Sequence, residues 1–365
     1  MTRLLLAATV AALTFLSPAL AQDAPKGSEA PAPAPAPAPA PSNLELTAAF
    51  EPAECQVGAM PNLVVKLTNK GTGPADIVGA ESQGEGKPAK LLEDRAVVGF
   101  EVQLDDGKAM PYERIHASPT APRTDWPKLS LAAGATAQLT VPFPALCAGT
   151  WKVTARYQRD KVAAPATLVV KPTAEGSTEV EVVMITDLGP MCFRLFPHQA
   201  PSTYLNFARL VMAGGEFQTK RRANYYDGLT FHRVIPGFMI QGGDPAGDGT
   251  GGPGYGIPAE FAAEKPAKQP AAHGPGRLAM ARSGHPESAG CQFYICVGNP
   301  TNLDGQYAVF GEVSKGLDVA YTISETDTVT PPGSSGEEKS RPAQDIHIRT
   351  VRIVPGPAPQ KPAGQ

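Results

Sequence analysis

Short runs of alternating apolar and polar residues, separated by turn-forming residues, recur through most of this chain. The run at 151–157 alternates cleanly, and residues 63–68, 97–104, 137–143 and 167–171 form further short strand-like runs broken by turn residues. A period of two is typical of β-strands that bury one face. No convincing helical pattern interrupts these runs between residues 43 and 172. The chain is therefore predicted to be mostly β, with an immunoglobulin-like β-sandwich at residues 43–172.

A second group of strand-like runs, between residues 180 and 354, surrounds one clear helical pattern. The helix is expected to begin at Pro201, because proline fits a first helical turn, and to end at Gly214-Gly215. Its apolar face would carry Tyr204, Phe207, Ala208, Val211 and Met212. Strands with about two helices fit a closed β-barrel capped at its ends, which we predict for residues 178–355.

Two folded domains also agree with the length of 365 residues, since one hydrophobic core seldom serves a chain of that size. Proline-rich segments flank these domains. Proline and alanine alternate from Pro31 to Pro41, so residues 22–42 are predicted to form a semi-rigid extended linker. Residues 356–365 are again rich in proline and are predicted to be a disordered tail.

The first 21 residues have the pattern of an export signal. Arg3 precedes an apolar run at 4–16, and Ala19-Leu20-Ala21 forms a small-residue cleavage site before Gln22. The apolar run is shorter than the ~20 residues that a membrane-spanning helix needs. We therefore expect residues 1–21 to be a signal peptide, and the mature protein to be periplasmic or extracellular without stable membrane insertion.

Composition argues against several other classes of protein. The net charge is −3 and the basic residues are dispersed, which argues against a nucleic-acid-binding surface. The six histidines have no metal-ligand spacing. Residues 247–252 satisfy G-x-G-x-x-G, but Pro253 and Pro258 forbid the helix that a dinucleotide site requires. We predict no metal, no cofactor and no nucleic-acid partner, and a monomeric protein.

Five cysteines would enter an oxidising compartment after export. Cys55 and Cys147 both lie in the first domain, and a bridge between them would constrain the unfolded chain by ~4–5 kcal/mol. We predict this disulfide, with two unpaired buried thiols as the alternative. Cys192, Cys291 and Cys296 are expected to be small buried residues.

The run 226–244 carries the clearest chemical signal. Its alternating, strand-like centre holds the cation Arg233, the amide Gln241 and the pair Phe238-Met239, without an acid, base or nucleophile among them. Such a set suits a reaction in which no covalent bond is made. Rotation about a prolyl peptide bond is a reaction of this kind.

This run resembles the signature of the cyclophilin-type peptidyl-prolyl isomerases almost residue for residue. Three further segments are similar to that family in the same order, at 201–207, at 274–281 with 290–295, and at 303–311. The resemblance covers about residues 178–355. It implies a closed, eight-stranded antiparallel β-barrel with a substrate groove on its outer face, and proline-containing polypeptides as clients.

The resemblance also implies the residues of the site. The proline ring would enter a pocket built by Phe238, Met239, Tyr294 and Leu303. The groove would further use the residues His232, Arg233, Gln241, Ala281, Arg282, Gln292, Asn302 and Tyr307.

Four of these residues depart from the commonest pattern of the family. Asn302 stands where many members have tryptophan, which predicts weak binding of the inhibitor cyclosporin. Tyr294, Tyr307 and Arg282 stand where phenylalanine, histidine and asparagine are common. The two tyrosines keep an aromatic ring, so catalytic activity is expected to survive.

The chemistry gives Arg233 and Gln241 their predicted catalytic roles. Partial double-bond character sets a barrier of ~18–20 kcal/mol, and in the twisted transition state the prolyl nitrogen regains its lone pair. A guanidinium near this nitrogen would bind the twisted amide better than the planar one, which is the differential binding that accelerates a step. We expect Arg233 to supply ~2–4 kcal/mol in this way. Gln241 would hold the substrate carbonyl or orient Arg233.

Structural alternatives exist for several of these residues. His232 and Arg233 could pair with surface carboxylates, and Phe238, Met239 and Tyr294 could belong to the core. Alternation also keeps Phe238 and Met239 from facing the same side of a regular strand, although Pro236-Gly237 favours a local irregularity there. For the whole chain, the alternative is an exported binding protein that holds proline-containing segments without turnover. The set Arg233, Phe238, Met239 and Gln241 favours the enzyme, because binding alone would not require it.

Overall fold

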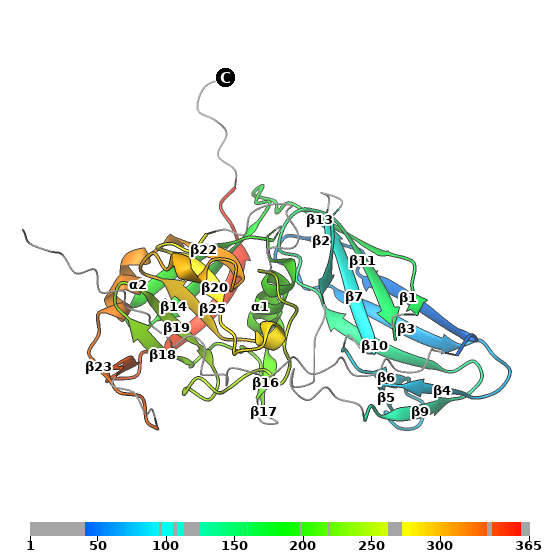
Figure 1. Ribbon diagram of the computed structural model, residues 1–365. Helices are drawn as coiled ribbons and strands as arrows, with labels where there is room; N and C mark the ends of the chain where they lie inside the picture. Colours follow the sequence, from blue (N-terminus) through cyan, green and yellow to red (C-terminus); the bar gives the residue numbers. More distant parts are fainter. Residues whose placement is uncertain are drawn as a thin grey trace, which may run out of the picture.

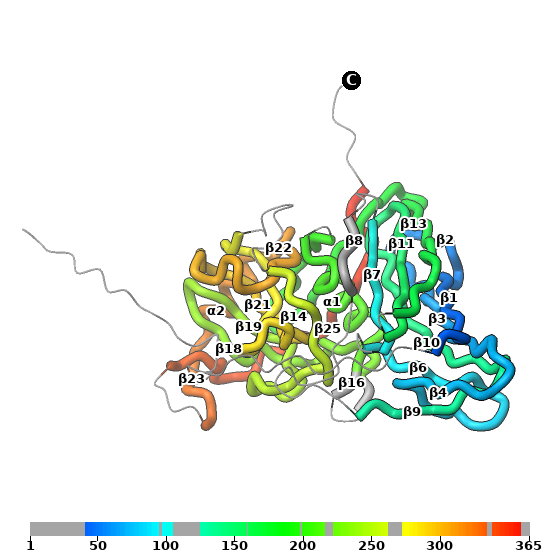
Figure 2. The backbone as a smooth tube through the Cα atoms, turned by 45° about the vertical axis from the view of Figure 1, so that its right-hand side comes forward, coloured from blue at the N-terminus to red at the C-terminus, as the bar shows by residue number. Residues whose placement is uncertain are grey.

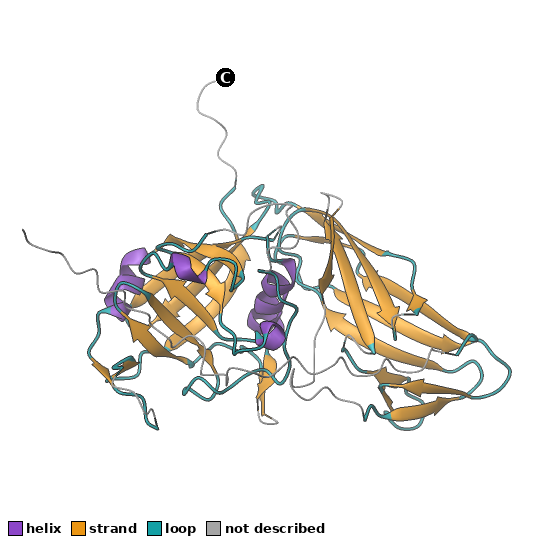
Figure 3. Ribbon diagram, in the orientation of Figure 1, coloured by secondary structure: helices purple, strands orange, loops and turns teal. Residues whose placement is uncertain are grey.

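The computed structural model describes residues 41–94, 97–104, 108–112, 125–158, 160–197, 199–217, 220–261, 272–333 and 338–358. The predicted signal peptide, the linker up to residue 40 and the tail from residue 359 lie outside these residues. Figure 1 shows two β-rich parts with helix α1 (Pro201–Ala213) between them, and Figure 3 shows how strongly strands dominate both. The prediction of a mostly β chain is confirmed.

The N-terminal part contains two sheets. The first is ordered β1 (Leu44–Glu51), β3 (Asn62–Asn69), β10 (Thr136–Pro142), β6 (Ala89–Leu91), β5 (Ala80–Glu81). The second is ordered β2 (Glu54–Gln56), β13 (Ala166–Lys171), β11 (Gly149–Tyr157), β7 (Val98–Leu104), β8 (Lys108–Tyr112), with β12 (Lys161–Val162) on β11. A separate ribbon joins β4 (Ala75–Val78) to β9 (Lys128–Leu131).

Aromatic side chains fill the space between these two sheets. The Phe143 ring meets Phe50 of β1 edge-on at 5.2 Å and Trp151 of β11 at 5.5 Å between centroids. Trp151, Val153, Ala155 and Tyr157 alternate as buried residues along β11, as the period of two predicted. The immunoglobulin-like connectivity remains a prediction.

The structure contradicts the predicted Cys55–Cys147 disulfide. All five cysteines lie in the described ranges, and none of them forms a disulfide. Cys55 lies in β2 opposite Val170 of β13, whereas the backbone of Cys147 forms an isolated antiparallel β-bridge with Glu179. The Cys147 thiol shares a hydrogen bond with the buried hydroxyl of Tyr204. Its side chain is therefore committed to the junction with α1 rather than to β2.

The C-terminal part is built on one eight-stranded antiparallel sheet. Its order is β18 (Thr230–Ile235), β19 (Met239–Asp244), β21 (Phe293–Cys296), β20 (Arg277–Met280), β22 (Val309–Lys315), β15 (Gly189–Leu195), β14 (Val180–Thr186), β25 (Ile348–Pro355). Smaller elements are β16 (Gly215–Phe217) with β17 (Lys220–Arg222), β23 (Thr328–Val329) with β24 (Arg341–Pro342), and the 3₁₀ turns η1 (Pro286–Ser288) and η2 (Thr301–Leu303).

The sheet curls but does not close, which corrects the predicted closed barrel. The end strands of the sheet are β18 and β25, and among the described residues no continuous ladder joins them. Within those residues, their only β-pairing is an isolated antiparallel bridge between Thr230 and His347. Beyond that point the edge of β18 has another partner, because the Val234 N–H donates to the Ser340 carbonyl at 2.7 Å. The segment before β24 thus occupies the edge that β25 would need.

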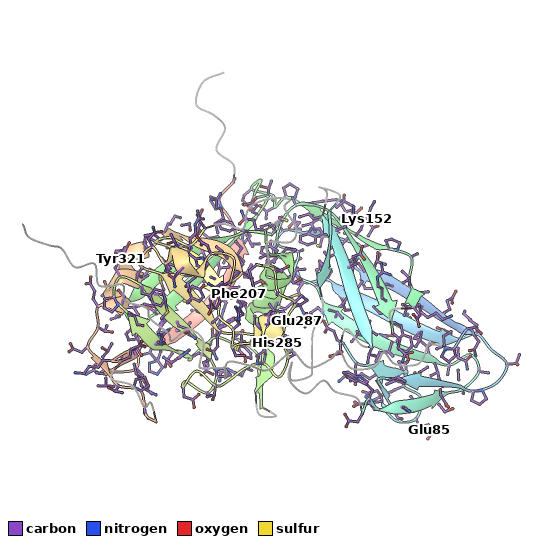
Figure 4. All side chains as sticks on the ribbon, in the orientation of Figure 1. Glu85, Lys152, Phe207, His285, Glu287 and Tyr321 are labelled. Atoms are coloured by element: carbon purple, nitrogen blue, oxygen red, sulfur yellow. The ribbon has the colours of Figure 1, made fainter. Side chains whose placement is uncertain are left out.

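Helix α1 has the predicted bounds, since Pro201 lies in its first turn and Gly214 (φ 71°) follows its end. The Glu260 carboxylate accepts hydrogen bonds from the Ser202 and Thr203 N–H groups, both at 2.8 Å, and so satisfies the first turn. Phe207, labelled in Figure 4, packs from α1 against Phe310 at 5.3 Å between ring centroids. The second helix is α2 (Leu317–Ser324). In the described part of the chain, neither helix has the length and apolar character needed to traverse a bilayer.

Candidate active site

The run 226–244 contains a hairpin, where the sequence suggested one strand-like stretch. The turn between β18 and β19 has Pro236 at its second position and Gly237, with φ 68°, at its third. The Phe238 N–H closes it by donating to the Ile235 carbonyl at 3.1 Å. This is the chemistry of a type II turn, which requires a positive φ at the third position.

The hairpin brings the two predicted catalytic residues face to face. Arg233 pairs with Gln241 across the ladder, Gln241 pairs with Tyr294 of β21, and Tyr294 pairs with Ala279 of β20. Directly opposite residues point to the same face of a sheet. Arg233, Gln241 and Tyr294 therefore form one row on the same face, as the predicted groove required.

A carboxylate holds the guanidinium of Arg233. Its Nε and Nη2 both donate to Oε1 of Glu338, at 3.2 and 3.0 Å. The Arg233 side chain is 14% exposed and that of Glu338 is 37% exposed. The third nitrogen, Nη1, is buried and has no hydrogen-bond partner among the described residues. Arg233 does pair with a carboxylate, as the structural alternative stated. The pair leaves the Nη1 nitrogen without a hydrogen-bond partner among the described residues.

The amide of Gln241 is fixed from the other side. Its Nε2 donates to Oε1 of Gln292 at 3.0 Å. Gln292 in turn donates from Nε2 to the carbonyls of Gly249 and Gly251, both at 2.9 Å. These successive hydrogen bonds connect Gln241, the middle residue of the row, to the loop after β19.

An apolar cluster separate from the main core continues the same face. It contains Met239, Ala279, Ala281, Tyr294, Cys296, Leu303, Tyr307 and Val309, bordered by Phe196, Ile235 and Phe238. Phe238 and Met239 can share it because Phe238 belongs to the turn and Met239 begins β19. All four predicted pocket residues are therefore together. Met239 and Tyr294 have no exposed surface, so they form the floor, and Phe238 is the half-buried member.

Two residues that sequence reasoning missed are linked by hydrogen bonds to the Tyr294 hydroxyl. The Tyr294 hydroxyl is 2.8 Å from Nε2 of His273, whose Nδ1 is 2.7 Å from Oδ1 of Asp304. Burial lowers the pKa of His273, and the His273 backbone N–H lowers the pKa of Asp304. A neutral imidazole therefore donates to a carboxylate and accepts from Tyr294. Asp304 stood in the 303–311 segment, but no sequence signal connected it with His273.

Arg282 and Tyr307 form the rim beside Tyr294. The Arg282 guanidinium lies between the rings of Phe261 and Tyr307, 4.9 and 4.8 Å from their centroids. Tyr307 meets Tyr294 edge-on at 5.7 Å. A cation over an aromatic face is attracted to it, so Arg282 steadies Tyr307 across the cluster.

The remaining predicted groove residues differ in how far they are exposed. Asn302 is exposed on η2, next to the buried Leu303, whereas Ala281 is buried and bonds through its N–H to the Gln292 carbonyl at 2.8 Å. His232 lies at an irregularity in the β18–β19 ladder and is only 8% exposed. Neither of its ring nitrogens has a hydrogen-bond partner among the described residues. Little of the His232 surface is exposed, and its role in the groove stays a prediction.

Comparison with known proteins agrees with this geometry. Residues 181–353 match the family model described as cyclophilin type peptidyl-prolyl cis-trans isomerase/CLD. Peptidyl-prolyl cis-trans isomerase B of Streptomyces anulatus is 40% identical over 175 residues, which are 46% of this chain and 93% of the relative. Its namesake from Bacillus subtilis is 41% identical over 146 residues, or 40% of this chain and 91% of the relative.

A solved structure is also similar. It is a cyclophilin type isomerase of Cryptosporidium parvum, crystallised in the presence of the dipeptide Ala-Pro, at 29% identity and a TM-score of 0.38. The match covers 48% of this chain and 98% of that one. The two bacterial relatives are 40% and 41% identical to this chain, and the matches cover 93% and 91% of their own lengths. This chain therefore belongs to the cyclophilin-type peptidyl-prolyl cis-trans isomerases, and it is an enzyme that accelerates rotation about peptidyl-prolyl bonds.

Proposed function

We propose that the chain isomerises X-Pro bonds of exported polypeptides without covalent chemistry, and that Arg233 stabilises the twisted amide. The row Arg233, Gln241 and Tyr294 beside an apolar cluster carries this proposal. It offers a permanent cation, an amide and an apolar surface on one face of the sheet. A rotation about a C–N bond needs no more than these.

Arg233 acts on the nitrogen that changes most during the reaction. The prolyl nitrogen is a poor acceptor while resonance delocalises its lone pair, and it becomes a good acceptor when the bond is twisted. The Arg233 guanidinium, whose side chain is 14% exposed, is the donor for this lone pair. Because the hydrogen bond strengthens only in the twisted state, it lowers the barrier rather than merely tightening substrate binding.

The neighbouring side chains hold the two ends of the rotating bond. Phe238 gives the proline ring a half-buried aromatic surface at the edge of the cluster. Gln241 receives the substrate carbonyl, with its own position set by Gln292. Because the ring is held while the acyl side turns, a larger fraction of bound substrate is in the geometry from which rotation occurs.

Export and the monomeric state belong to the same proposal. Arg3, the apolar run 4–16 and Ala19-Leu20-Ala21 support a signal peptide that is cleaved before Gln22 and leaves no stable membrane insertion. Mass spectrometry of the protein from its native cells should give a chain that begins at Gln22. A cytoplasmic protein that retains residues 1–21 would refute export.

The mechanism is tested by the variant Arg233→Ala, measured by exchange NMR on a peptide that contains Ala-Pro. Loss of ~2–4 kcal/mol of transition-state stabilisation predicts a rate roughly 30- to 1,000-fold lower. Arg349→Ala is the matched control, because it removes another arginine that is paired with a carboxylate, at the exposed position 349. Catalysis by Arg233→Ala at the wild-type rate would exclude the proposed role of Arg233.

A further inference from the structure

The ion pair between Arg233 and Glu338 divides the guanidinium into two edges. Both contacts to the carboxylate come from the Nε and Nη2 edge, at 3.2 and 3.0 Å, and both end on Oε1. Nη1 lies outside this pair, buried and without a partner among the described residues. Arginine offers five N–H donors in a rigid planar fork, so fixing one edge also fixes the direction of the other.

The backbone that carries Glu338 is itself anchored to the strand of Arg233. Two residues further on, the buried Ser340 accepts a hydrogen bond from the Val234 N–H at 2.7 Å. Lys339 accepts one from the Thr328 hydroxyl of β23 at 3.2 Å. Val234 directly follows Arg233 in β18. The carboxylate and the guanidinium therefore come from two segments that are bonded to each other beside the site.

We infer that Glu338 is a positioning residue for catalysis, which holds Arg233 by its Nε and Nη2 edge and so fixes the guanidinium in the orientation in which it acts on the prolyl nitrogen. This inference rests on the role of Arg233 in the proposed function. Glu338 does not touch the reacting atoms in this arrangement. It limits the rotamers of a long side chain that would otherwise have to be ordered during each catalytic cycle.

The same carboxylate also has an opposite electrostatic effect. Its negative charge partly offsets the positive field that Arg233 exerts on the twisted amide. Orientation and charge can be separated, because glutamine keeps an oxygen acceptor and loses the charge, whereas alanine loses both. A positioning role predicts that Glu338→Gln stays near the wild-type rate and that Glu338→Ala does not.

The decisive measurement is exchange NMR with an Ala-Pro peptide and the full chain, resolved into kcat and KM. We expect Glu338→Ala to lower kcat about tenfold with KM nearly unchanged, within the ~10²-fold that a misplacement of ~1 Å can cost. Glu338→Gln should remain within about twofold of wild type, since the acceptor is kept. Asp345→Ala is the matched control, because Asp345 pairs with Arg341 in the same region and not with Arg233.

The Arg233→Ala background separates this inference from the proposed function. There, Glu338→Ala should have no further effect, because a residue that acts through Arg233 cannot act without it. If Arg233→Ala is slower than wild type but Glu338→Ala catalyses at the wild-type rate, the positioning role of Glu338 is overturned and the role of Arg233 stands. A fast Arg233→Ala would instead overturn the proposed role of Arg233.

Two further results would overturn the positioning role. One is a Glu338→Ala variant that is faster than wild type, since this would make Glu338 a restraint on Arg233. The other is an unchanged Arg233 Nε–H resonance in the spectrum of Glu338→Ala, because loss of the carboxylate must alter that hydrogen bond. Circular dichroism of both Glu338 variants checks that they are folded, and Glu338→Gln keeps the test valid if alanine disturbs the segment.

Discussion

His232 and Arg233 are adjacent residues whose environments differ sharply. The Arg233 guanidinium pairs with the Glu338 carboxylate at 3.0 Å. Burial lowers the pKa of His232 to about 4. The nearby Asp244 does not pair with the ring, because its carboxylate accepts from the N–H groups of Ala246, Asp248 and Gly249. His232 is therefore neutral at pH 7.

This pKa has a consequence for stability in acid. The unfolded chain takes up a proton on His232 below pH ~6.5, whereas the folded chain does so only below about 4. Stability is therefore lost as the pH falls through this window, by ~1.4 kcal/mol per pH unit and about 3 kcal/mol in total. Denaturant unfolding of wild type and His232→Gln between pH 4 and 7.5 measures the difference. Equal slopes for the two proteins between pH 4 and 6.5 would contradict it, and above pH 7 the slopes should agree.

At the scale of elements, the β18–β19 hairpin decides whether the site exists. Its turn places Arg233 opposite Gln241, and it depends on Gly237 at φ 68°. An added Cβ would meet nothing within 4 Å there, so the cost of Gly237→Ala is backbone strain alone. We expect a loss of roughly 1–2 kcal/mol in the free energy of unfolding. Gly252→Ala is the matched control, since it has equal space and no positive φ. Equal denaturation midpoints for the two variants would refute the strain argument.

Local patterns predicted the elements better than their pairing. Helix α1 was predictable with its bounds because Pro201 and Gly214 act within one turn of the chain. The sequence pattern predicted one strand-like run in place of the hairpin, because Pro236 and Gly237 interrupt the alternation for only two residues. The Glu338 contact to Arg233 spans 105 positions and has no local signature. The closed barrel was wrong because Ser340 takes the edge of β18, and sequence pattern does not reveal competition between distant partners for one edge.

At the scale of the whole molecule, α1 joins the two β-rich parts. Figures 1 and 2 both show it between the N-terminal part and the curled sheet, with β18 and β19 on the side of α1 away from the N-terminal part. Phe207 packs toward the sheet, while Arg209 reaches the other way and binds Glu93 of the N-terminal part. The two Nη atoms of Arg209 donate to the two carboxylate oxygens at 2.7 and 3.1 Å. The two parts are therefore predicted to unfold together.

Glu93→Ala tests this coupling. Both partners are nearly buried, with 5% of the Arg209 side chain and 10% of the Glu93 side chain exposed, and removing one partner of a buried pair costs ~3–5 kcal/mol. Both tryptophans, Trp126 and Trp151, lie in the N-terminal part, so their fluorescence reports its unfolding, and loss of isomerase activity reports the other part. The two thermal transitions should coincide in wild type and separate in Glu93→Ala. Glu101→Ala breaks an exposed ion pair with Arg156 within the N-terminal part, so it should cost less than ~1 kcal/mol and leave the two transitions coincident. Coincident transitions in Glu93→Ala would refute the proposed role of this ion pair, because the charged link would then be dispensable for the coupling.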